Sequence, residues 1–460
     1  MSGKSAKASR VSRRRFIEGA SAGSVVALAG CTGGQDTDSD SGGSTGGSGP
    51  IQLTYWHQEA PPQRQAMFEE FTERFNAEHD DIQVEVQGQN WGSVFSKLTS
   101  ALEAGNAPDF IFSLPAFTMD FQARGELVDV TDIVEDINSE HDMYQSAISP
   151  FQYQGGTWGI PMWDMVFLNH YRTDTLGQTS VWPPQNWDEW LQASAEVTGD
   201  GQYGTVMPAS STLWTTENIY TLMINNDSYV YGPDGNVMFD TPETVEVLDF
   251  YKQMYEQSSP DTTSWSWGEW ETSILRGTAH STIGFSSWMR RLVDTEFADD
   301  FSAIPQPYPE GGSAGSIHYV NDVMVFNEEK KDAIGTFIKW MHSEAIYGDW
   351  LAKTEPTLYL PVTKTGEESE DFWNHPVVSR YEPSVRAQFE ALPDARIYGF
   401  RDIHVENDLY IPSVGLLESS NVLADVVQEL VVNDRTPAEA ATWGQETMQE
   451  LLGLEPSSSL

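Results

Sequence analysis

The chain has 460 residues, with 25 Lys and Arg against 69 Asp and Glu, and a formal net charge of −44. This balance excludes nucleic acid as a partner, because phosphate binding needs basic patches, and an anionic membrane surface would repel the folded body. The composition, 39% hydrophobic and 12% aromatic, is that of a globular protein, and the length predicts two or three domains.

The acidic residues are dispersed along the chain, and lysine is scarce. Such a composition resembles that of proteins adapted to strong salt, in which self-repulsion is screened. We therefore expect a halophilic source, specifically an archaeon. A cation-binding surface is the alternative explanation of the charge.

The amino-terminal segment is basic, then apolar, then small, which is the layout of an export signal. SRRRFI, from residue 12, resembles a twin-arginine signal, and LAGC, ending at Cys31, resembles a lipobox. No other cysteine is present, so an internal disulfide is excluded. We expect a signal over 1–30, a flexible Gly/Ser/Asp tether over 31–50, and a lipid anchor on Cys31 at the outer face of the cell membrane.

Strand and helix patterns alternate at the start of the remaining chain. The β-forming stretch 51–57 is followed by a helix over 61–79, a strand over 81–89, a helix over 91–106 and a short buried strand over 107–114. This order predicts a parallel sheet with right-handed crossovers. Ligands of such sheets bind beyond the carboxyl ends of the strands.

The later chain is predicted to be mostly helical. Residues 155–177 indicate a hairpin-like entry, a strand and a turn, and 267–291 indicate a helix followed by a strand. Helices are further expected at 182–194 with Asn186 as the cap, 241–257, 328–351, 420–431 and 437–453.

Several motifs occur in a specific order. LTSALEAGNAPDFIFS and WGIPMWDMVFLNHY are followed by WPPQNWDEW, GTAHSTIGFSSW and EKKDAIGTFIKWM. From residue 51 to about 365 the chain resembles the extracellular solute-binding proteins of ABC importers, the family that contains maltose-binding protein.

The resemblance implies an α/β fold of two lobes that are joined by a hinge and close on a ligand. By analogy, the chain crosses between lobes near Thr131, Pro305 and Glu355. The expected lobe 1 is 51–130 plus 306–355, and the expected lobe 2 is 131–305 plus 356–460.

The sixteen tryptophans favour a carbohydrate ligand. Aromatic faces stack on the apolar face of a pyranose ring, and carboxylates and amides bind its polar rim. The resemblance places Trp163 and Asp164 beside a ligand-contacting motif and Trp288 where the family carries a stacking tryptophan. Trp340 and Trp350 are expected in the core. The candidate ligand-binding residues are Trp56, His57, Gln58, Trp91, Ser113, Phe117, Trp163, Asp164, Trp214, Trp267, Trp288 and Arg290.

The resemblance implies a monomeric, non-enzymatic receptor that delivers a sugar or oligosaccharide to an ABC permease in the membrane. No cofactor is expected, and no metal, because no second histidine lies at ligand spacing from His57. Three alternatives stay open: a non-sugar solute such as glycerol 3-phosphate or another polyol derivative, a secreted carbohydrate-active enzyme, and an adhesin. Asn226, in Asn226-Asp227-Ser228, begins the one sequon of the sequence.

Overall fold

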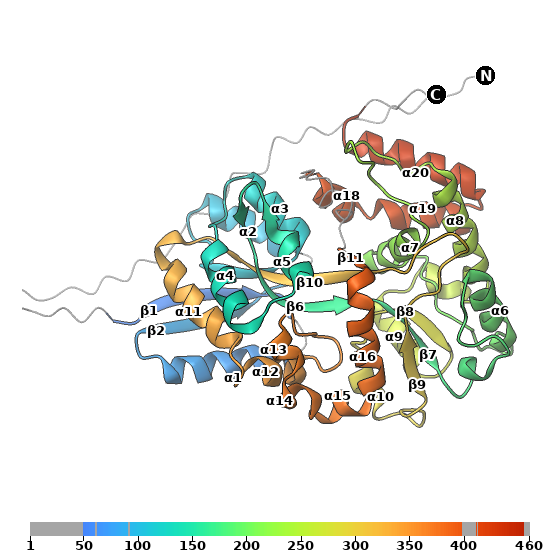
Figure 1. The fold of residues 1–460 in the computed structure, drawn as a ribbon. Coiled ribbons are helices and arrows are strands. Elements are labelled where there is room, and N and C mark those ends of the chain that lie inside the picture. The colour runs from blue at the N-terminus through green and yellow to red at the C-terminus, as the bar shows by residue number, and fades with distance from the viewer. Residues whose placement is uncertain (1–48, 60–61, 91–92, 398–410, 412, 455–460) are drawn as a thin grey trace, which may run out of the picture. The chain divides into compact units, whose positions relative to one another are not determined.

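The computed structural model describes residues 49–59, 62–90, 93–397, 411 and 413–454 (Figure 1). The strands are β1 (Ile51–His57), β2 (Ile82–Gly88), β3 (Phe110–Ser113), β4 (Gln152–Tyr153), β5 (Gly156–Thr157), β6 (Ile160–Val166), β7 (Leu168–Arg172), β8 (Ser281–Gly284), β9 (Phe301–Ile304), β10 (Ser316–Val325) and β11 (Ala395–Ile397). The α-helices are α1 (Pro62–Glu78), α2 (Val94–Glu103), α3 (Pro115–Ala123), α4 (Thr131–His141), α5 (Gln145–Ile148), α6 (Trp187–Val197), α7 (Leu213–Asn225), α8 (Pro242–Tyr255), α9 (Trp267–Leu275), α10 (Met289–Leu292), α11 (Lys331–Met341), α12 (Tyr347–Thr354), α13 (Lys364–Glu367), α14 (Glu370–Trp373), α15 (Pro376–Arg380), α16 (Glu382–Ala391), α18 (Val414–Ser420), α19 (Val422–Val431) and α20 (Pro437–Leu451). Short 3₁₀ turns are η1 (Ser149–Phe151), η2 (Leu176–Gln178), η3 (Pro260–Thr263), η4 (Glu328–Lys330) and η5 (Leu392–Asp394).

Two main sheets organise the described part of the chain, beside the two-stranded sheet of β4 and β5. The larger sheet has the order β11-β10-β3-β1-β2, and β6 also pairs with β10. β1 is parallel to β2 and β3, as the alternating pattern predicts, but β10 runs antiparallel to β3 and to β6, so the sheet is mixed. The smaller sheet is antiparallel, in the order β8-β7-β9.

The chain passes between the two sheets at Phe167. β6 pairs with β10 of the larger sheet, whereas β7, which begins one residue after Phe167, pairs with β8 and β9. A crossing at Thr131 is therefore wrong for the sheets: α4, which starts there, packs on α11 and α13 instead. The chain passes from the smaller sheet back to the larger one between β9 and β10.

Each sheet carries its own helices (Figure 1). α1 packs on β2 and α12, and α11 packs on β1 and α4. On the other side α19 packs on α7 and α20, α8 packs on α6 and α7, and α16 packs on β9. We call these the first lobe and the second lobe, and the two-lobed α/β fold expected from the sequence is confirmed.

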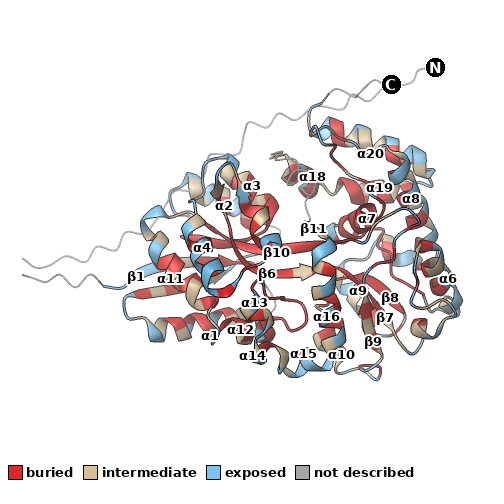
Figure 2. Ribbon diagram, viewed as in Figure 1, coloured by how far each residue is buried: buried red, intermediate tan, exposed pale blue. Residues whose placement is uncertain are grey.

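The core follows the periodicity of the sequence. Phe68, Phe71 and Phe75 of α1 are buried, because their three- and four-residue spacing places them on one helix face. Figure 2 shows buried residues along the strands and on the helix faces that cover them. The predicted cap is also confirmed, since the Asn186 side chain accepts a hydrogen bond of 2.9 Å from the backbone N–H of Glu189.

Two predicted elements differ from those observed. The helix expected over 328–351 is divided into α11 and α12, since α11 ends at Met341 and α12 begins only at Tyr347. The stretch 155–177 forms two long strands, β6 and β7, because the chain changes sheets within it.

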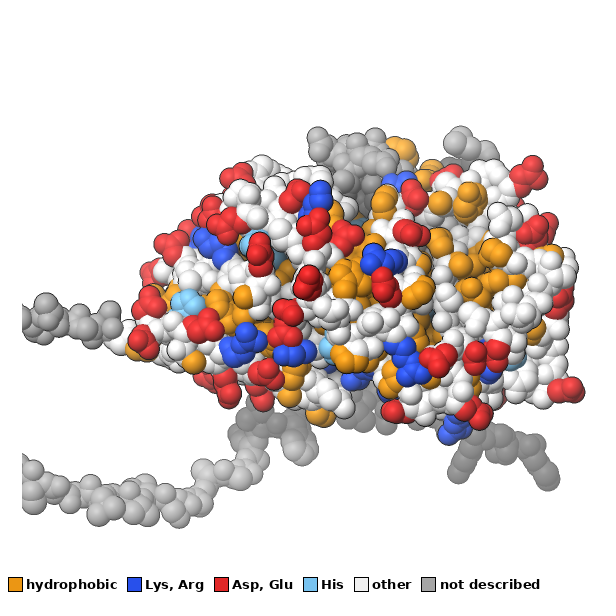
Figure 3. Space-filling view, turned by 60° about the horizontal axis from the view of Figure 1, so that its bottom comes forward, with side chains coloured by type: hydrophobic (Ala, Val, Ile, Leu, Met, Phe, Trp, Pro, Cys, Tyr) orange, Lys and Arg blue, Asp and Glu red, His pale blue; other side chains and the backbone are white. Residues whose placement is uncertain are grey.

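Figure 3 shows Asp and Glu side chains spread over the visible face, with fewer Lys and Arg. The predicted export signal, Cys31 and nearly all of the tether lie outside the described residues. Among the described residues, no helix is both long enough and apolar enough to cross a bilayer.

Candidate functional site

A cleft with a volume of about 660 Å³ lies between the lobes, a size typical of small-molecule sites. Both lobes and the strands that join them supply its walls. The lining residues are Glu59, Arg64, Phe95, Phe112, Leu114, Phe117, Met165, Leu213, Glu217, Trp267, Glu271, Phe285, Ser287, Tyr319, Asn321, Leu358, Tyr359, Glu418, Ser419 and Asn421.

Aromatic rings form much of the wall on the second-lobe side. The rings of Trp267 and Phe285 lie 6.4 Å apart, centroid to centroid, and are inclined by only 15°. Phe285 also contacts Tyr319 of β10, with 5.5 Å between centroids. Such surfaces suit the apolar face of a ring-shaped ligand.

An ion-pair network lies at the end of the cleft near α1. Arg64 binds Glu59, with 2.6 Å between Nη1 and Oε2, and also binds Glu355. Glu355 is fully buried and receives Arg290 of the second lobe as well, with 3.0 Å between Nε and Oε1. Burial raises the pKa of Glu355, and the two guanidinium groups oppose this rise. One carboxylate thus joins cations from both lobes.

Two other carboxyl groups of the cleft have no cationic partner among the described residues. Glu217 of α7 is 1% exposed, and its Oε1 accepts a hydrogen bond of 2.6 Å from the hydroxyl of Tyr319. Glu418 of α18 is 8% exposed. Burial raises the pKa of each to about 8, and the charge of Glu418 adds to the rise for Glu217.

Glu271 of α9, another carboxylate that lines the cleft, has a cationic partner. It forms an ion pair with Arg291 and accepts a hydrogen bond of 3.1 Å from the hydroxyl of Ser287. Among the described residues that line the cleft, the carboxyl groups outside any ion pair are therefore Glu217 and Glu418.

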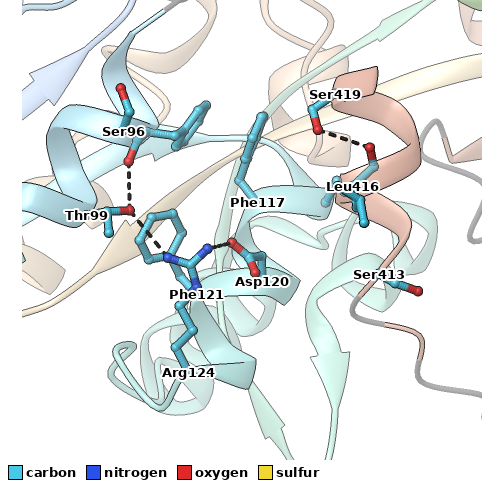
Figure 4. Close-up of a pocket in the computed structure, with 12 residues that line it drawn as sticks. Ser96, Thr99, Phe117, Asp120, Phe121, Arg124, Ser413, Leu416 and Ser419 are labelled. Atoms are coloured by element: carbon cyan, nitrogen blue, oxygen red, sulfur yellow. Dashed lines mark hydrogen bonds and ion pairs between the residues drawn. The ribbon is translucent and has the colours of Figure 1, made fainter. Parts of the chain in front are cut away.

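A second hollow of about 570 Å³ adjoins the cleft, between α2, α3 and α18. Phe95, Phe117 and Ser419 line both cavities, and the rings of Phe95 and Phe117 stack at 3.6 Å. In Figure 4 Phe117 extends toward α18, and Arg124 lies between Thr99 and Asp120. A ligand longer than the main cleft could extend past Phe117.

Only Phe117 and Trp267 of the predicted site residues line the main cleft. Trp91 lies outside the described residues. The remaining predicted residues are buried behind the wall or lie beside it.

The residues predicted at the end of β1 are inside the first lobe. Trp56 donates from its indole N–H to Gln87 Oε1 at 3.0 Å, and the His57 ring stacks on Phe68 at 4.3 Å. Gln58 donates to the backbone carbonyl of Phe112, and Ser113 is fully buried. Glu59, the next residue along, is the one that reaches the cleft.

Trp163 and Asp164 lie one layer behind the wall. The Trp163 ring is fully buried and stacks on Tyr359, a wall residue, with 4.4 Å between centroids. Asp164 pairs with His318 across β6 and β10, with 2.8 Å between Oδ2 and Nδ1. Their part in the cleft is support of Tyr359 and of the strands that join the lobes.

The second-lobe tryptophans are also buried. Trp214 packs 6.2 Å from Trp267, centroid to centroid, and Trp288 packs 5.1 Å from Phe301. Both side chains are fully buried, as is the expected core residue Trp350, whereas Trp340 is only partly buried. Arg290 lies beside the cleft, on Glu355.

Helical spacing would have identified cleft residues that the sequence analysis missed. Leu213 and Glu217 lie four residues apart on α7, and Trp267 and Glu271 lie four apart on α9, and all four line the cleft. No group of His, Cys, Asp and Glu among the described residues could hold a metal ion.

Comparison with known proteins agrees with this architecture. Residues 59–347 match the family model described as bacterial extracellular solute-binding protein. A putative ABC transporter periplasmic-binding protein of Escherichia coli, YcjN, is 19% identical over 410 residues, 87% of this chain and 93% of its own length. An arabinooligosaccharide-binding protein of Halalkalibacterium halodurans is 22% identical over 428 residues, 87% of this chain and 89% of its own.

Solved structures share the fold. The cyclic alpha-maltosyl-1,6-maltose binding protein of Arthrobacter globiformis superimposes with a TM-score of 0.71 at 18% identity, over 88% of this chain and 99% of its own.

Proposed function

Because the chain belongs to the family of bacterial extracellular solute-binding proteins, we propose that it is the receptor of an ABC importer for a sugar or oligosaccharide. The observation that carries the substrate class is the cleft between the lobes, where the aligned rings of Trp267 and Phe285 lie among carboxyl and amide groups. The relatives and structural neighbours named for sugars support the same class.

Capture proceeds by closure of the two lobes. A ligand that contacts both lobes stabilises the closed form by its differential affinity for that form. The pairs of Glu355 with Arg64 and Arg290 join the lobes beside the cleft and add to the stability of the arrangement described here. The closed receptor then delivers its ligand to a membrane permease, whose ATPase subunits supply the energy.

The export and anchoring of the protein rest on its sequence. SRRRFI directs export through the twin-arginine route, and lipidation of Cys31 holds a monomeric receptor at the outer face of the cell membrane. The acidic composition adapts it to strong salt, as in a halophilic archaeon.

Strand pairing supports a proposal for the lobe boundaries. We place the first crossing at Phe167 and the second between β9 and β10. The carboxyl-terminal part is divided, since α14 packs on α12 of the first lobe and α16 packs on β9 of the second.

An enzymatic role is the second candidate, and Glu217 with Glu418 is the observation that favours it. A glycosidase needs two carboxyl groups that flank the scissile bond. Incubation with oligosaccharides and analysis of the products distinguishes the two functions: a receptor returns its ligand intact, and released monosaccharide would overturn the receptor function.

The experiment that tests the receptor function is a binding screen by thermal shift and calorimetry against mono-, di- and oligosaccharides, polyols, amino acids and glycerol phosphates. A sugar at ~100 times its dissociation constant should stabilise the protein by about 2.7 kcal/mol. Trp267→Ala should abolish this shift, whereas Trp443→Ala on α20, another partly buried tryptophan that does not line the cleft, should preserve it. Binding of non-sugars alone would overturn the substrate class. If both variants lost binding, the loss in Trp267→Ala could not be assigned to the cleft.

A further inference from the structure

Most of the ionisable side chains that line the cleft are held in ion pairs, and two carboxyl groups are not. Among the described lining residues, Arg64 is the one cation, and it is already bound by Glu59 and Glu355. Glu271 is bound by Arg291. Glu217 and Glu418 have no cationic partner in the part of the chain that the structure describes.

Both carboxyl groups present an oxygen that lacks a partner. Oε2 of Glu217 and Oε2 of Glu418 are each buried, and neither accepts a hydrogen bond from the residues that the structure describes. Leaving a buried polar atom unpaired is costly, so such atoms are normally satisfied by protein, water or ligand. The two side chains come from α7 and α18 and line the same cleft, and they are close enough for the charge of Glu418 to act on Glu217.

We propose that the cleft selects a carbohydrate that bears a protonated amine, such as an amino sugar or an oligosaccharide of amino sugars. The ammonium group donates to Glu217 and Glu418, and the sugar ring packs against Trp267 and Phe285. This inference rests on the proposed receptor function and narrows its substrate class.

Charge decides between the ligand classes. An ammonium group offers three donors and a positive charge, and hydrogen bonds between charged partners are about twice as strong as neutral ones. A neutral sugar offers only hydroxyl groups and brings no positive charge that would favour the ionised form of either carboxyl group. A phosphorylated ligand such as glycerol 3-phosphate would add negative charge beside two buried carboxyl groups, so the cleft disfavours it.

Matched probes test the proposal directly. Calorimetry on the purified protein measures the affinity for three β-1,4-linked disaccharides: cellobiose, the amine-bearing chitosan dimer and its N-acetylated form. The pairs glucose with glucosamine and galactose with galactosamine extend the comparison to other rings. We expect at least one amine form to bind roughly tenfold more tightly than its hydroxyl and acetamide counterparts.

Variants locate the source of the preference. The double substitution Glu217→Gln and Glu418→Gln removes both carboxyl groups with little change of volume. The variant should bind the amine and hydroxyl forms with about equal affinity. Glu256→Gln, which neutralises an exposed glutamate that does not line the cleft, is the matched control and should keep the amine preference. If circular dichroism shows the double variant to be unfolded, each single variant should lower the preference.

The outcomes are distinct. If neutral sugars bind as tightly as their amine counterparts, the receptor function stands and the amine inference fails. If the preference persists in the folded carboxamide variants, Glu217 and Glu418 are not its source and the inference also fails. If no probe in any series binds, both the inference and the sugar-receptor function fall.

Discussion

Glu217→Gln in the ligand-free protein should raise stability at alkaline pH. The substitution replaces a carboxyl group that is 1% exposed by a neutral amide of nearly the same shape. The amide oxygen can still accept a hydrogen bond from the hydroxyl of Tyr319, as the carboxyl oxygen does at 2.6 Å. What the substitution removes is the need to ionise a group inside the protein.

The magnitude follows from the pKa. Burial raises the pKa of Glu217 from 4.5 to about 8. The native state therefore holds a proton that the unfolded chain has lost between these two values, and the free energy of unfolding must fall as the pH rises from 4.5 to 8. The full loss for one carboxyl group is at most about 5 kcal/mol, and structural relaxation lowers it.

Urea unfolding of wild type and variant at pH 5, 6, 7 and 8 measures this difference. The two proteins should be of similar stability at pH 5, and the variant should gain progressively, by on the order of 2–4 kcal/mol at pH 8. Glu256→Gln, on an exposed glutamate, should follow the wild-type curve at every pH. A variant curve parallel to that of the wild type would refute the argument, since it would mean that Glu217 ionises as easily in the native state as in the unfolded chain.

Three further predictions concern other parts of the chain. Trp163→Ala should lower the free energy of unfolding by about 3–5 kcal/mol in urea titrations, because its fully buried ring leaves a cavity behind Tyr359; a loss below about 1 kcal/mol would contradict its place in the core. Glu355→Gln should cost about 3 kcal/mol in the same assay, since Arg64 and Arg290 both lose a buried partner, and an unchanged midpoint would show that these pairs add nothing. Cys31→Ser should release the protein into the medium without altering ligand affinity, and retention of the variant in the membrane fraction would count against lipid anchoring.

Local patterns predicted the elements well where one face of a helix or strand meets the core. The phenylalanines of α1, the cap at Asn186 and the parallel pairing of β1 with β2 and β3 all follow from spacing within a few residues. The break between α11 and α12 and the passage at Phe167 were missed, because each depends on what a distant segment packs against.

The sequence predicted residues that lie near the cleft, but most of them do not line it. Trp163 and Trp214 each contact a cleft residue, Tyr359 and Trp267 respectively, but are themselves fully buried. A large aromatic ring next to a ligand surface and one behind it have the same sequence signature, since both are apolar and lie near strand ends or helix starts. Which of the two rings faces the cleft depends on the other segments of the chain that pack around it.

The sequence by itself determined the family, the two-lobed α/β class and the expectation of an aromatic cleft, because motif order and hydrophobic periodicity are local properties of the chain. The tertiary structure alone decided which side chains face the ligand. Glu217 and Glu418 belong to helices far apart in the sequence, and each is unremarkable among 69 acidic residues. Packing of the two helices around one cleft buries both carboxyl groups without a cation among the described residues, and this shared burial raises the pKa of both.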